Sequence, residues 1–154
     1  MSAMKPFSIR RLLARDQEMF RQLLAVFGRA FEENDTYMSA QPGAAYLEAL
    51  LGGDQFIALA ALEGDNVIGG LAAYVLKKFE RERSEVYIYD LAVEEAHRRM
   101  GVATALIEFL KPIASDRGAH VIFIQADASD GPAVALYSKF GIREDVLHFD
   151  IVPS

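Results

Sequence analysis

The segment Leu91-Ala-Val-Glu-Glu-Ala-His-Arg-Arg-Met-Gly-Val-Ala-Thr104 decides how this chain is interpreted. An apolar strand ends, a short arginine-rich loop follows, and glycine and small residues then open a helix. The free N–H groups and the dipole of a helix N-terminus favour an anion, and Gly101 and Ala103 let such a group approach the backbone. Arg98 and Arg99 add positive charge and hydrogen-bond donors. The segment predicts a phosphate-binding site, although a plain strand-to-helix loop with solvated arginines explains the same spacing.

Apolar patterns on both sides of this segment predict the remaining elements. Alternating or continuous apolar runs predict strands, and apolar residues three and four positions apart predict helices. The predicted order is a strand at 7–12, helices at 16–31 and 44–51, strands at 56–62, 67–76 and 85–93, a helix from 102 to about 118, a strand at 120–125, a helix at 132–140 and a last strand at 146–151. Antiparallel strands that lead into strand–helix units predict an α/β (α+β) fold. Its sheet is mixed, mostly antiparallel and flanked by about four helices, in one domain over 1–154.

Three local features refine these predictions. Asp16 precedes the first helix and is a candidate N-cap. The polar, acidic stretch 32–37 is expected to be a connection. Pro112 removes a backbone donor, so we expect the third helix to kink or end early there.

Composition excludes several classes of function. The 154 residues contain no cysteine, which rules out disulfides, a thiolate nucleophile and cysteine-based metal sites. With 16 Lys and Arg against 22 Asp and Glu, the net charge of −6 argues against nucleic-acid binding. Such acidity usually serves solubility, but it also suits an enzyme that attracts polycationic substrates.

The sequence also predicts the location of the protein in the cell. Its longest apolar run, 56–62, has seven residues, far short of the roughly 20 that cross a bilayer. The opening residues 1–6 lack the apolar stretch of a secretory signal. We therefore expect a soluble, cytoplasmic protein with no membrane partner.

Competing motifs are missing from the sequence. It contains no GxxxxGK[ST], GxGxxG, HExxH or GxSxG motif, which removes the usual signatures of nucleotide triphosphatases, dinucleotide enzymes, zinc proteases and serine hydrolases. The three histidines, at positions 97, 120 and 148, are isolated from one another. We expect them to be structural or surface residues, and we expect no metal site.

Two motifs, in order along the chain, resemble one family. Arg98-x-x-Gly101-x-Ala103 resembles the (Q/R)-x-x-G-x-(G/A) motif of the GNAT superfamily of acetyl-CoA-dependent N-acetyltransferases, which lies between a strand and the next helix. Further along, Asp130-x-x-Ala133-x-x-Leu-Tyr-x-Lys-x-Gly-Ile142 is similar to the family's N-x-x-A-x-x-L-Y-x-K-x-G-F. Asp130 and Ile142 depart from the usual Asn and Phe. An aspartate near a cofactor phosphate would repel it, so Asp130 is expected to orient the loop, or the loop itself differs.

The resemblance extends, over about residues 20–153, to one branch of that superfamily, the type I aminoglycoside 3-N-acetyltransferases. It is carried by five stretches: Phe56-Ile-Ala-Leu-Ala-Ala, Ala72-Ala-Tyr-Val-Leu, Ser84-Glu-Val-Tyr-Ile-Tyr-Asp-Leu-Ala-Val, Pro132-Ala-Val-Ala-Leu-Tyr and Gly141-Ile-Arg-Glu-Asp-Val-Leu-His-Phe-Asp. Members of this branch acetylate the 3-amino group of the 2-deoxystreptamine ring and so confer antibiotic resistance. The resemblance implies acetyl-CoA as donor and an aminoglycoside as acceptor, and it is compatible with a homodimer.

The resemblance also implies roles for residues. Those expected to bind the cofactor, acetyl-CoA, are Leu91, Ala92, Val93, Arg98, Arg99, Met100, Gly101, Val102, Ala103, Thr104, Asp130 and Ala133. The backbone N–H near Leu91 would polarise the thioester carbonyl. Tyr137 is the candidate general acid toward the leaving thiolate, and Asp90 would hold and deprotonate the attacking ammonium, directly or through water.

Carboxylates and tyrosines are expected to select the substrate, because aminoglycosides carry several ammonium groups. The candidates are Glu33, Asp35, Tyr37, Glu85, Asp90 and Asp150. Tyr37, Tyr87 and Tyr89 could stack on sugar rings, although strand tyrosines usually pack in a core. Each of these carboxylates is, taken singly, more often a solvated surface charge. Two other functions stay open: a GNAT enzyme acting on a polyamine or peptide amine, and a non-catalytic module that binds acyl-CoA.

Overall fold

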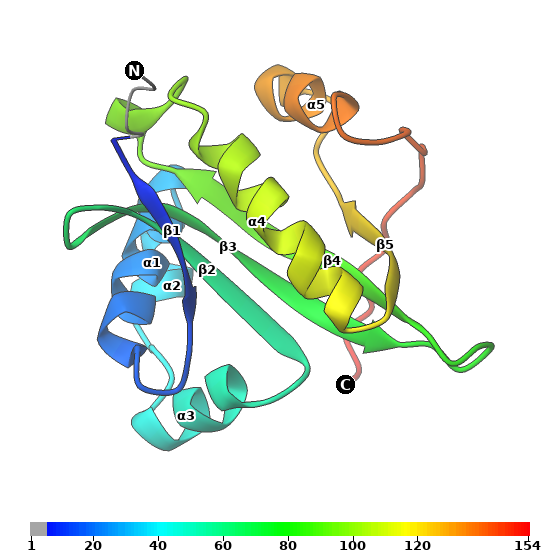
Figure 1. Ribbon diagram of the computed structural model, residues 1–154, viewed down its shortest axis with the longest axis horizontal. Coiled ribbons are helices and arrows are strands. Elements are labelled where there is room, and N and C mark those ends of the chain that lie inside the picture. The colour runs from blue at the N-terminus through cyan, green and yellow to red at the C-terminus, as the bar shows by residue number, and fades with distance from the viewer. Residues whose placement is uncertain (1–5) are drawn as a thin grey trace.

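The computed structural model describes residues 6–154, and Figure 1 shows their helices and strands around one sheet. Residues 1–5 belong to the opening stretch interpreted above as lacking a secretory signal, and they lie outside the described residues. The elements are β1 (Ser8–Leu12), α1 (Gln17–Ala30), α2 (Asn34–Met38), α3 (Ala44–Gly52), β2 (Phe56–Glu63), β3 (Asn66–Lys77), β4 (Ser84–Val93), the 3-10 turn η1 (Glu95–His97), α4 (Val102–Asp116), β5 (Ala119–Ile124) and α5 (Gly131–Ser138). No helix in this part of the chain is long and apolar enough to cross a membrane.

The sheet is mixed and mostly antiparallel, as predicted. Its spatial order, β1-β2-β3-β4-β5, is the order along the chain. The pairs from β1 to β4 are antiparallel, whereas β4 and β5 are parallel because α4 carries the chain back between them. The two-residue turn between β2 and β3 contains Gly64 at φ 60°, a left-handed conformation that tight hairpin turns require.

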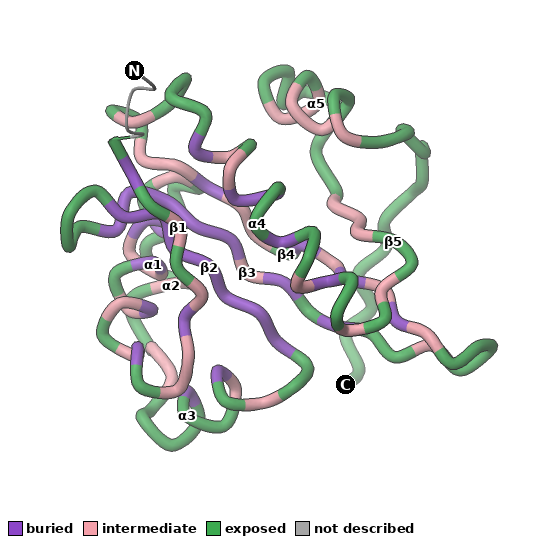
Figure 2. Tube along the Cα trace, viewed as in Figure 1, coloured by how far each residue is buried: buried purple, intermediate pink, exposed green. Residues whose placement is uncertain are grey.

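Helices cover both faces of the sheet. Figure 1 shows α4 in front of the strands and α1 behind them. The core beneath α4 includes Ile57, Leu59, Leu71, Val86, Ile88, Leu106 and Leu110. The core on the other face includes Phe20, Leu23, Phe27, Leu47, Ala58, Ala60 and Ala92. Figure 2 shows that buried residues run along β2 and β3, which are therefore the centre of the molecule.

The backbone of β3 lies directly beneath α1. A Cβ built on Gly70 would lie 2.5 Å from Cδ1 of Leu23, and it would also overlap the carbonyl oxygen of Leu59. Leu23 is fully buried, so it cannot move aside without disturbing the core. Glycine at position 70 therefore sets how closely α1 approaches the sheet.

Asp16 occupies the N-cap position of α1, as predicted, but its side chain does not cap the helix. Its carboxylate instead accepts a hydrogen bond from Arg10 Nη2 at 2.6 Å and another from the backbone N–H of Leu13 at 2.8 Å. The carboxylate is buried in the turn between β1 and α1, where these donors offset its lost hydration. Asp16 therefore ties the first strand to the first helix.

Three other expectations need correction. The stretch 32–37 is not only a connection, because residues from Asn34 onward form the short helix α2. Helix α4 runs through Pro112 to Asp116 without ending early. Pro112 and Glu108, whose carbonyl loses its helical donor, both lie on the exposed side, where water can bind that carbonyl. The predicted last strand at 146–151 is not paired in this structure, and its residues are exposed.

Replacing Gly70 tests the close approach of α1. We expect Gly70→Ala to lower the free energy of unfolding by about 1–3 kcal/mol, because the added methyl overlaps buried atoms. Gly43→Ala is the control, since a Cβ there meets no described atom within 4 Å. Urea denaturation of the three proteins measures the difference. Equal stability of the two variants would contradict the packing described here.

Candidate functional site

One extra residue in β4 determines where Asp90 points. The β3 residues that pair with Ile88 and Asp90 are consecutive, so Tyr89 between them has no partner. Ile88 lies in the core beneath α4, whereas Ala92, beyond the bulge, lies in the core beneath α1. In a regular strand, positions 88, 90 and 92 would share one face. The bulge at Tyr89 therefore turns Asp90 from the α4 face toward α1 and α2.

The carboxylate of Asp90 is held by a tyrosine of α2. The hydroxyl of Tyr37 donates to Asp90 Oδ2 at 2.8 Å. The Tyr37 ring packs against Phe27 and Phe31 of the α1 end, with ring centroids 5.9 and 6.0 Å away. This aromatic cluster fixes the hydroxyl over the carboxylate. Tyr37 was predicted to contact substrate, but its bond to Asp90 was not predicted.

Burial and charge act on Asp90 in the same direction. Burial raises the pKa of Asp90, the hydrogen bond from Tyr37 opposes that shift, and the nearby negative charge of Glu33 raises the pKa further. Burial and the bond to Asp90 raise the pKa of Tyr37, so its hydroxyl stays protonated and remains a donor. Within residues 6–154, Asp90 forms no ion pair with a Lys, Arg or His side chain. The structure thus brings together Glu33, Tyr37 and Asp90 in a position suited to a cation.

Aromatic rings form a row beside Asp90. Tyr89 contacts both Tyr74 and Tyr87, with ring centroids 5.8 and 5.5 Å apart. Tyr87 stacks on Phe123 of β5 at 4.6 Å and an interplanar angle of 9°. Tyr89 is 60% exposed and Tyr74 39% exposed, so this row is open to solvent. Flat, half-exposed rings of this kind can pack against the apolar faces of sugars.

The end of β4 separates from β5. Their pairing runs from Ser84 with Ala119 to Ile88 with Ile124, and no further pair is formed in the described chain. The edge of Leu91–Val93 that faces β5 is consequently not part of the ladder. An extended group could hydrogen-bond to this edge as a strand would.

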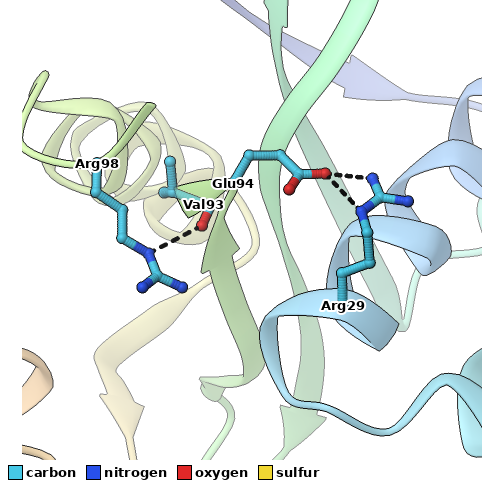
Figure 3. A network of polar contacts seen from close by, with 4 residues as sticks. All are labelled: Arg29, Val93, Glu94 and Arg98. Atoms are coloured by element: carbon cyan, nitrogen blue, oxygen red, sulfur yellow. Dashed lines mark hydrogen bonds and ion pairs between the residues drawn. The ribbon is translucent and has the colours of Figure 1, made fainter. Parts of the chain in front are cut away.

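Two arginines fix the loop that follows β4 from opposite sides (Figure 3). Arg98 Nε donates to the carbonyl of Val93 at 3.3 Å. Glu94 accepts from Arg29 Nε of α1 at 3.0 Å and also pairs with Arg29 Nη2. Arg98 is otherwise exposed, so it both shapes the loop and presents positive charge.

The start of α4 is open, as the sequence predicted for an anion site. Gly101 has φ 80° and precedes the helix, which has no side-chain cap. A Cβ on Gly101 would meet no described atom within 4 Å. Arg99 also adopts a left-handed conformation, at φ 65°. The N–H groups of the first helical turn and the two arginines can therefore approach a phosphate group.

Helix α5 carries Tyr137 and begins at Asp130. The Asp130 carboxylate accepts a hydrogen bond from the backbone N–H of Ala133 at 3.2 Å, so this residue caps the helix. Asparagine can cap in the same way, which gives a physical reason for aspartate at this position of the motif. Burial and the charge of Asp130 raise the pKa of Tyr137 to about 12.

Within residues 6–154, the other predicted substrate residues form no hydrogen bond or ion pair with Asp90. Glu85, at the opposite end of β4, pairs with Lys78 at 3.3 Å and lies 3.9 Å from His120. Asp150 is exposed near the C-terminus and lies 2.8 Å from His148. Asp35 is exposed in α2. Within residues 6–154 no group of three or more His, Asp and Glu could hold a metal ion.

Sequence reasoning missed Tyr74 and Phe123, which extend the aromatic row. Both lie in strands read only as apolar runs, and an aromatic residue in such a run carries no sign of which neighbour it will meet. The bulge at Tyr89 was missed for the same reason, because Tyr, Ile and Tyr are all typical strand residues.

Comparison with known proteins identifies close relatives. A family model described as the acetyltransferase (GNAT) family matches residues 17–142. A crystal structure of an aminoglycoside acetyltransferase from an uncultured soil metagenomic sample is 56% identical, covers 100% of both chains and has a TM-score of 0.94. Another aminoglycoside acetyltransferase from such a sample, in complex with sisomicin, is 31% identical over 96% of this chain and 97% of its own, with a TM-score of 0.87.

More distant relatives act on other amines. The [ribosomal protein bS18]-alanine N-acetyltransferase of Escherichia coli K12 is 27% identical over 86 residues, which is 56% of this chain and 57% of the relative. The match spans about half the length of the first curated relatives.

Removing the Tyr37 hydroxyl tests the contact with Asp90. We expect Tyr37→Phe to raise the pKa of Asp90, because the carboxylate loses the bond that favours its ionised form. The carboxyl carbon shift of Asp90, followed by NMR against pH, measures this pKa. Tyr46→Phe is the control. It removes a hydroxyl from a 65% exposed tyrosine of α3 and should leave the pKa of Asp90 unchanged. An unchanged or lowered pKa in Tyr37→Phe would contradict the observed geometry.

Proposed function

This chain belongs to the acetyltransferase (GNAT) family, and we propose that it transfers an acetyl group from acetyl-CoA to the 3-amino group of 2-deoxystreptamine aminoglycosides. The transfer would inactivate the antibiotic and so confer resistance. The full-length similarity to a soil aminoglycoside acetyltransferase supports this acceptor class. The observation that carries the proposal is the half-buried carboxylate of Asp90, which lies beside Glu33 and an exposed row of tyrosines.

The acceptor would bind through its charge and its rings. An ammonium group between Asp90 and Glu33 would supply the positive charge that these carboxylates lack. Tyr74 and Tyr89 would pack against the sugar rings. The net charge of −6 would draw a polycation toward the protein over a longer range. Asp35, Glu85 and Asp150 stay predictions as substrate contacts, and of these Glu85 lies at the other end of β4.

Asp90 would also prepare the amine for reaction. An ammonium has no free electron pair, so it must lose a proton before it can attack a thioester. Burial raises the pKa of Asp90 and so makes its carboxylate a stronger base than an exposed aspartate. The hydrogen bond from Tyr37 keeps one oxygen oriented and leaves the other for the amine, or for a water between them.

The donor would bind across the end of β4 and the start of α4. GNAT acetyltransferases use acetyl-CoA. The residues at these two places suit its pyrophosphate and its pantetheine arm. The open N-terminus of α4, with Arg98 and Arg99, suits the pyrophosphate. The unpaired edge of Leu91–Val93 suits the amides of the pantetheine arm, and the N–H of Leu91 would face the thioester carbonyl. Asp130 and Ala133 would position α5 beside the donor.

Tyr137 would act on the leaving thiolate. Its pKa of about 12 lies well above that of a thiol, roughly 8.5 for cysteine, so complete proton transfer from Tyr137 to sulfur is uphill. The hydroxyl is better suited to donate a hydrogen bond to sulfur while the C–S bond breaks. Tyr137 would then lower the barrier by stabilising developing negative charge.

A second acceptor class deserves a direct comparison. The similarity to an enzyme named for the alanine of ribosomal protein bS18 favours the N-terminal amine of a peptide. The acidic balance also permits a polyamine. Either acceptor could place an amine at Asp90, but a linear chain would use the tyrosine row less than a set of sugar rings would.

Acetylation of a panel of amines tests the acceptor. We expect kcat/KM for gentamicin or sisomicin to exceed that for spermidine, and that for a peptide with an N-terminal alanine, by about 100-fold or more. Release of free thiol measures the rates, and NMR of the product identifies the acetylated nitrogen. No turnover with any 2-deoxystreptamine antibiotic would overturn the acceptor class, whereas acetylation at another nitrogen would overturn only the 3-amino position.

Two conservative variants test whether the protein is an enzyme. We expect Asp90→Asn and Tyr137→Phe each to lower kcat by about 100-fold, with the Kd for CoA nearly unchanged by calorimetry. Asp65→Asn, in the β2–β3 turn, and Tyr46→Phe make the same chemical changes at exposed positions and should leave kcat unchanged. Unchanged rates in both site variants would overturn the roles given to Asp90 and Tyr137, whereas CoA binding without turnover in the wild-type chain would favour a non-catalytic module that binds acyl-CoA.

A further inference from the structure

Arg98 contacts the strand edge along which the donor would lie. We propose that Arg98 makes the protein selective for a donor that carries a pyrophosphate, because its guanidinium occupies the Val93 carbonyl until a phosphate group draws it away. The inference rests on the proposed function, since it assumes that acetyl-CoA binds across the end of β4 and the start of α4.

The Val93 carbonyl points away from β3. At the end of β4, the N–H of Glu94 donates to the carbonyl of Ile68 in β3 at 2.7 Å. Val93 pairs with Gly69 in the same register. In an antiparallel ladder the backbone groups of successive residues point to opposite sides, so Val93 and Leu91 turn theirs away from β3. Their N–H and C=O groups therefore lie on the side from which β5 has separated, which we call the free edge of β4.

Arg98 binds the free edge in this structure. Its Nε donates to the carbonyl oxygen of Val93 at 3.3 Å, as Figure 3 shows. An extended group that added to the free edge as a strand would bring an amide N–H to the same oxygen. The arginine and the amide of such a group therefore compete for one acceptor.

A phosphate group can draw Arg98 away from Val93. An arginine and a phosphate carry opposite charges and can form two parallel hydrogen bonds, whereas the carbonyl is neutral and accepts one bond from Arg98. Within residues 6–154, Arg98 forms no ion pair with an Asp or Glu side chain, so its charge is available to an anion. Arg98 is exposed, so its side chain can move without disturbing the core.

The end of β4 is fixed independently of Arg98. Glu94 pairs with Arg29 of α1 on the opposite side of the loop (Figure 3), and its N–H binds Ile68 of β3. Release of Arg98 would therefore free the Val93 carbonyl without displacing it. A complete donor would remove Arg98 through its pyrophosphate and then pair with the free edge. A thioester of pantetheine, which has no phosphate, would have to compete with Arg98.

Binding of CoA and of pantetheine tests the proposal, because pantetheine has the same arm without the phosphates. We expect Arg98→Ala to raise the Kd for CoA by about fivefold or more, since a contact between opposite charges is lost. The same variant should lower the Kd for pantetheine by about threefold or more, since the Val93 carbonyl is free. NMR titrations that follow the amide N–H groups of Leu91 and Val93 measure both constants. A residue that only attracts phosphate would not improve the binding of pantetheine.

Two further variants separate the hydrogen bond from the charge. Arg98→Gln has a nitrogen at the same position along the side chain as the arginine Nε, so it can keep the bond to Val93 without the charge. Arg99→Ala removes an equal charge from the loop and leaves the bond between Arg98 and Val93 in place. Both variants should weaken CoA binding and keep the wild-type Kd for pantetheine. Both positions are exposed, so all three variants should fold, as circular dichroism would verify.

A Kd for pantetheine that is unchanged or raised in Arg98→Ala would overturn the inference, since the carbonyl would then accept both donors at once. If pantetheine binds too weakly to titrate, kcat/KM for acetyl-pantetheine takes its place and should rise in this variant. A wild-type chain that binds neither CoA nor pantetheine would overturn the proposed donor, and this inference with it. Wild-type binding of CoA with no gain for pantetheine in Arg98→Ala would overturn the inference alone.

Discussion

The bulge at Tyr89 is the constraint on which the candidate site depends. A regular β4 would direct Asp90 toward α4, into a core of Val, Ile and Leu where a carboxylate has no partner. With one extra residue, the strand instead presents Asp90 to Tyr37 on the opposite face. The bulge also lies where the ladder between β4 and β5 stops, just after Ile88. A single local irregularity thus creates an acceptor position and a free strand edge next to each other.

The residues around Asp90 hold its carboxylate in a partly buried position, where a negative charge is unfavourable. Burial and Glu33 both disfavour an ionised Asp90, and the Tyr37 hydroxyl only partly offsets them. Tyr37 can do this because Phe27 and Phe31 fix its ring. A bound cation would relieve both penalties, so this arrangement favours a positively charged ligand. The short helix α2 has its function here, because it brings Glu33 and Tyr37 to β4.

Much of the fold was predictable because apolar periodicity is local. Strands β1 to β5 and helices α1, α3, α4 and α5 lie close to their predicted ranges. The open turn before α4 was also predictable, since Gly101 adopts the left-handed conformation that glycine favours. Helix α2 was missed because it is only five residues long and polar.

The arrangement of the site depends on contacts that a sequence does not display. In the sequence, Glu33 and Glu85 are two acidic residues near apolar segments, and nothing distinguishes their roles. In the structure Glu33 lies close enough to Asp90 to raise its pKa, whereas Glu85 is engaged by Lys78 at the other end of the strand. The bulge decides that Asp90 faces α1 and α2 rather than α4, and a run of Tyr, Ile and Tyr gives no sign of it.

The part of the chain after α4 contacts both α4 and the tyrosine row. Helix α5 buries none of its residues in the described chain. It is followed by Phe140, whose ring lies 5.1 Å from Lys111 Nζ of α4. β5 pairs with the first half of β4, packs Ile122 and Ile124 against the core beneath α4, and stacks Phe123 on Tyr87. Because Tyr87 also contacts Tyr89, the ring stack that joins β4 and β5 continues into the tyrosine row that is proposed to bind the acceptor.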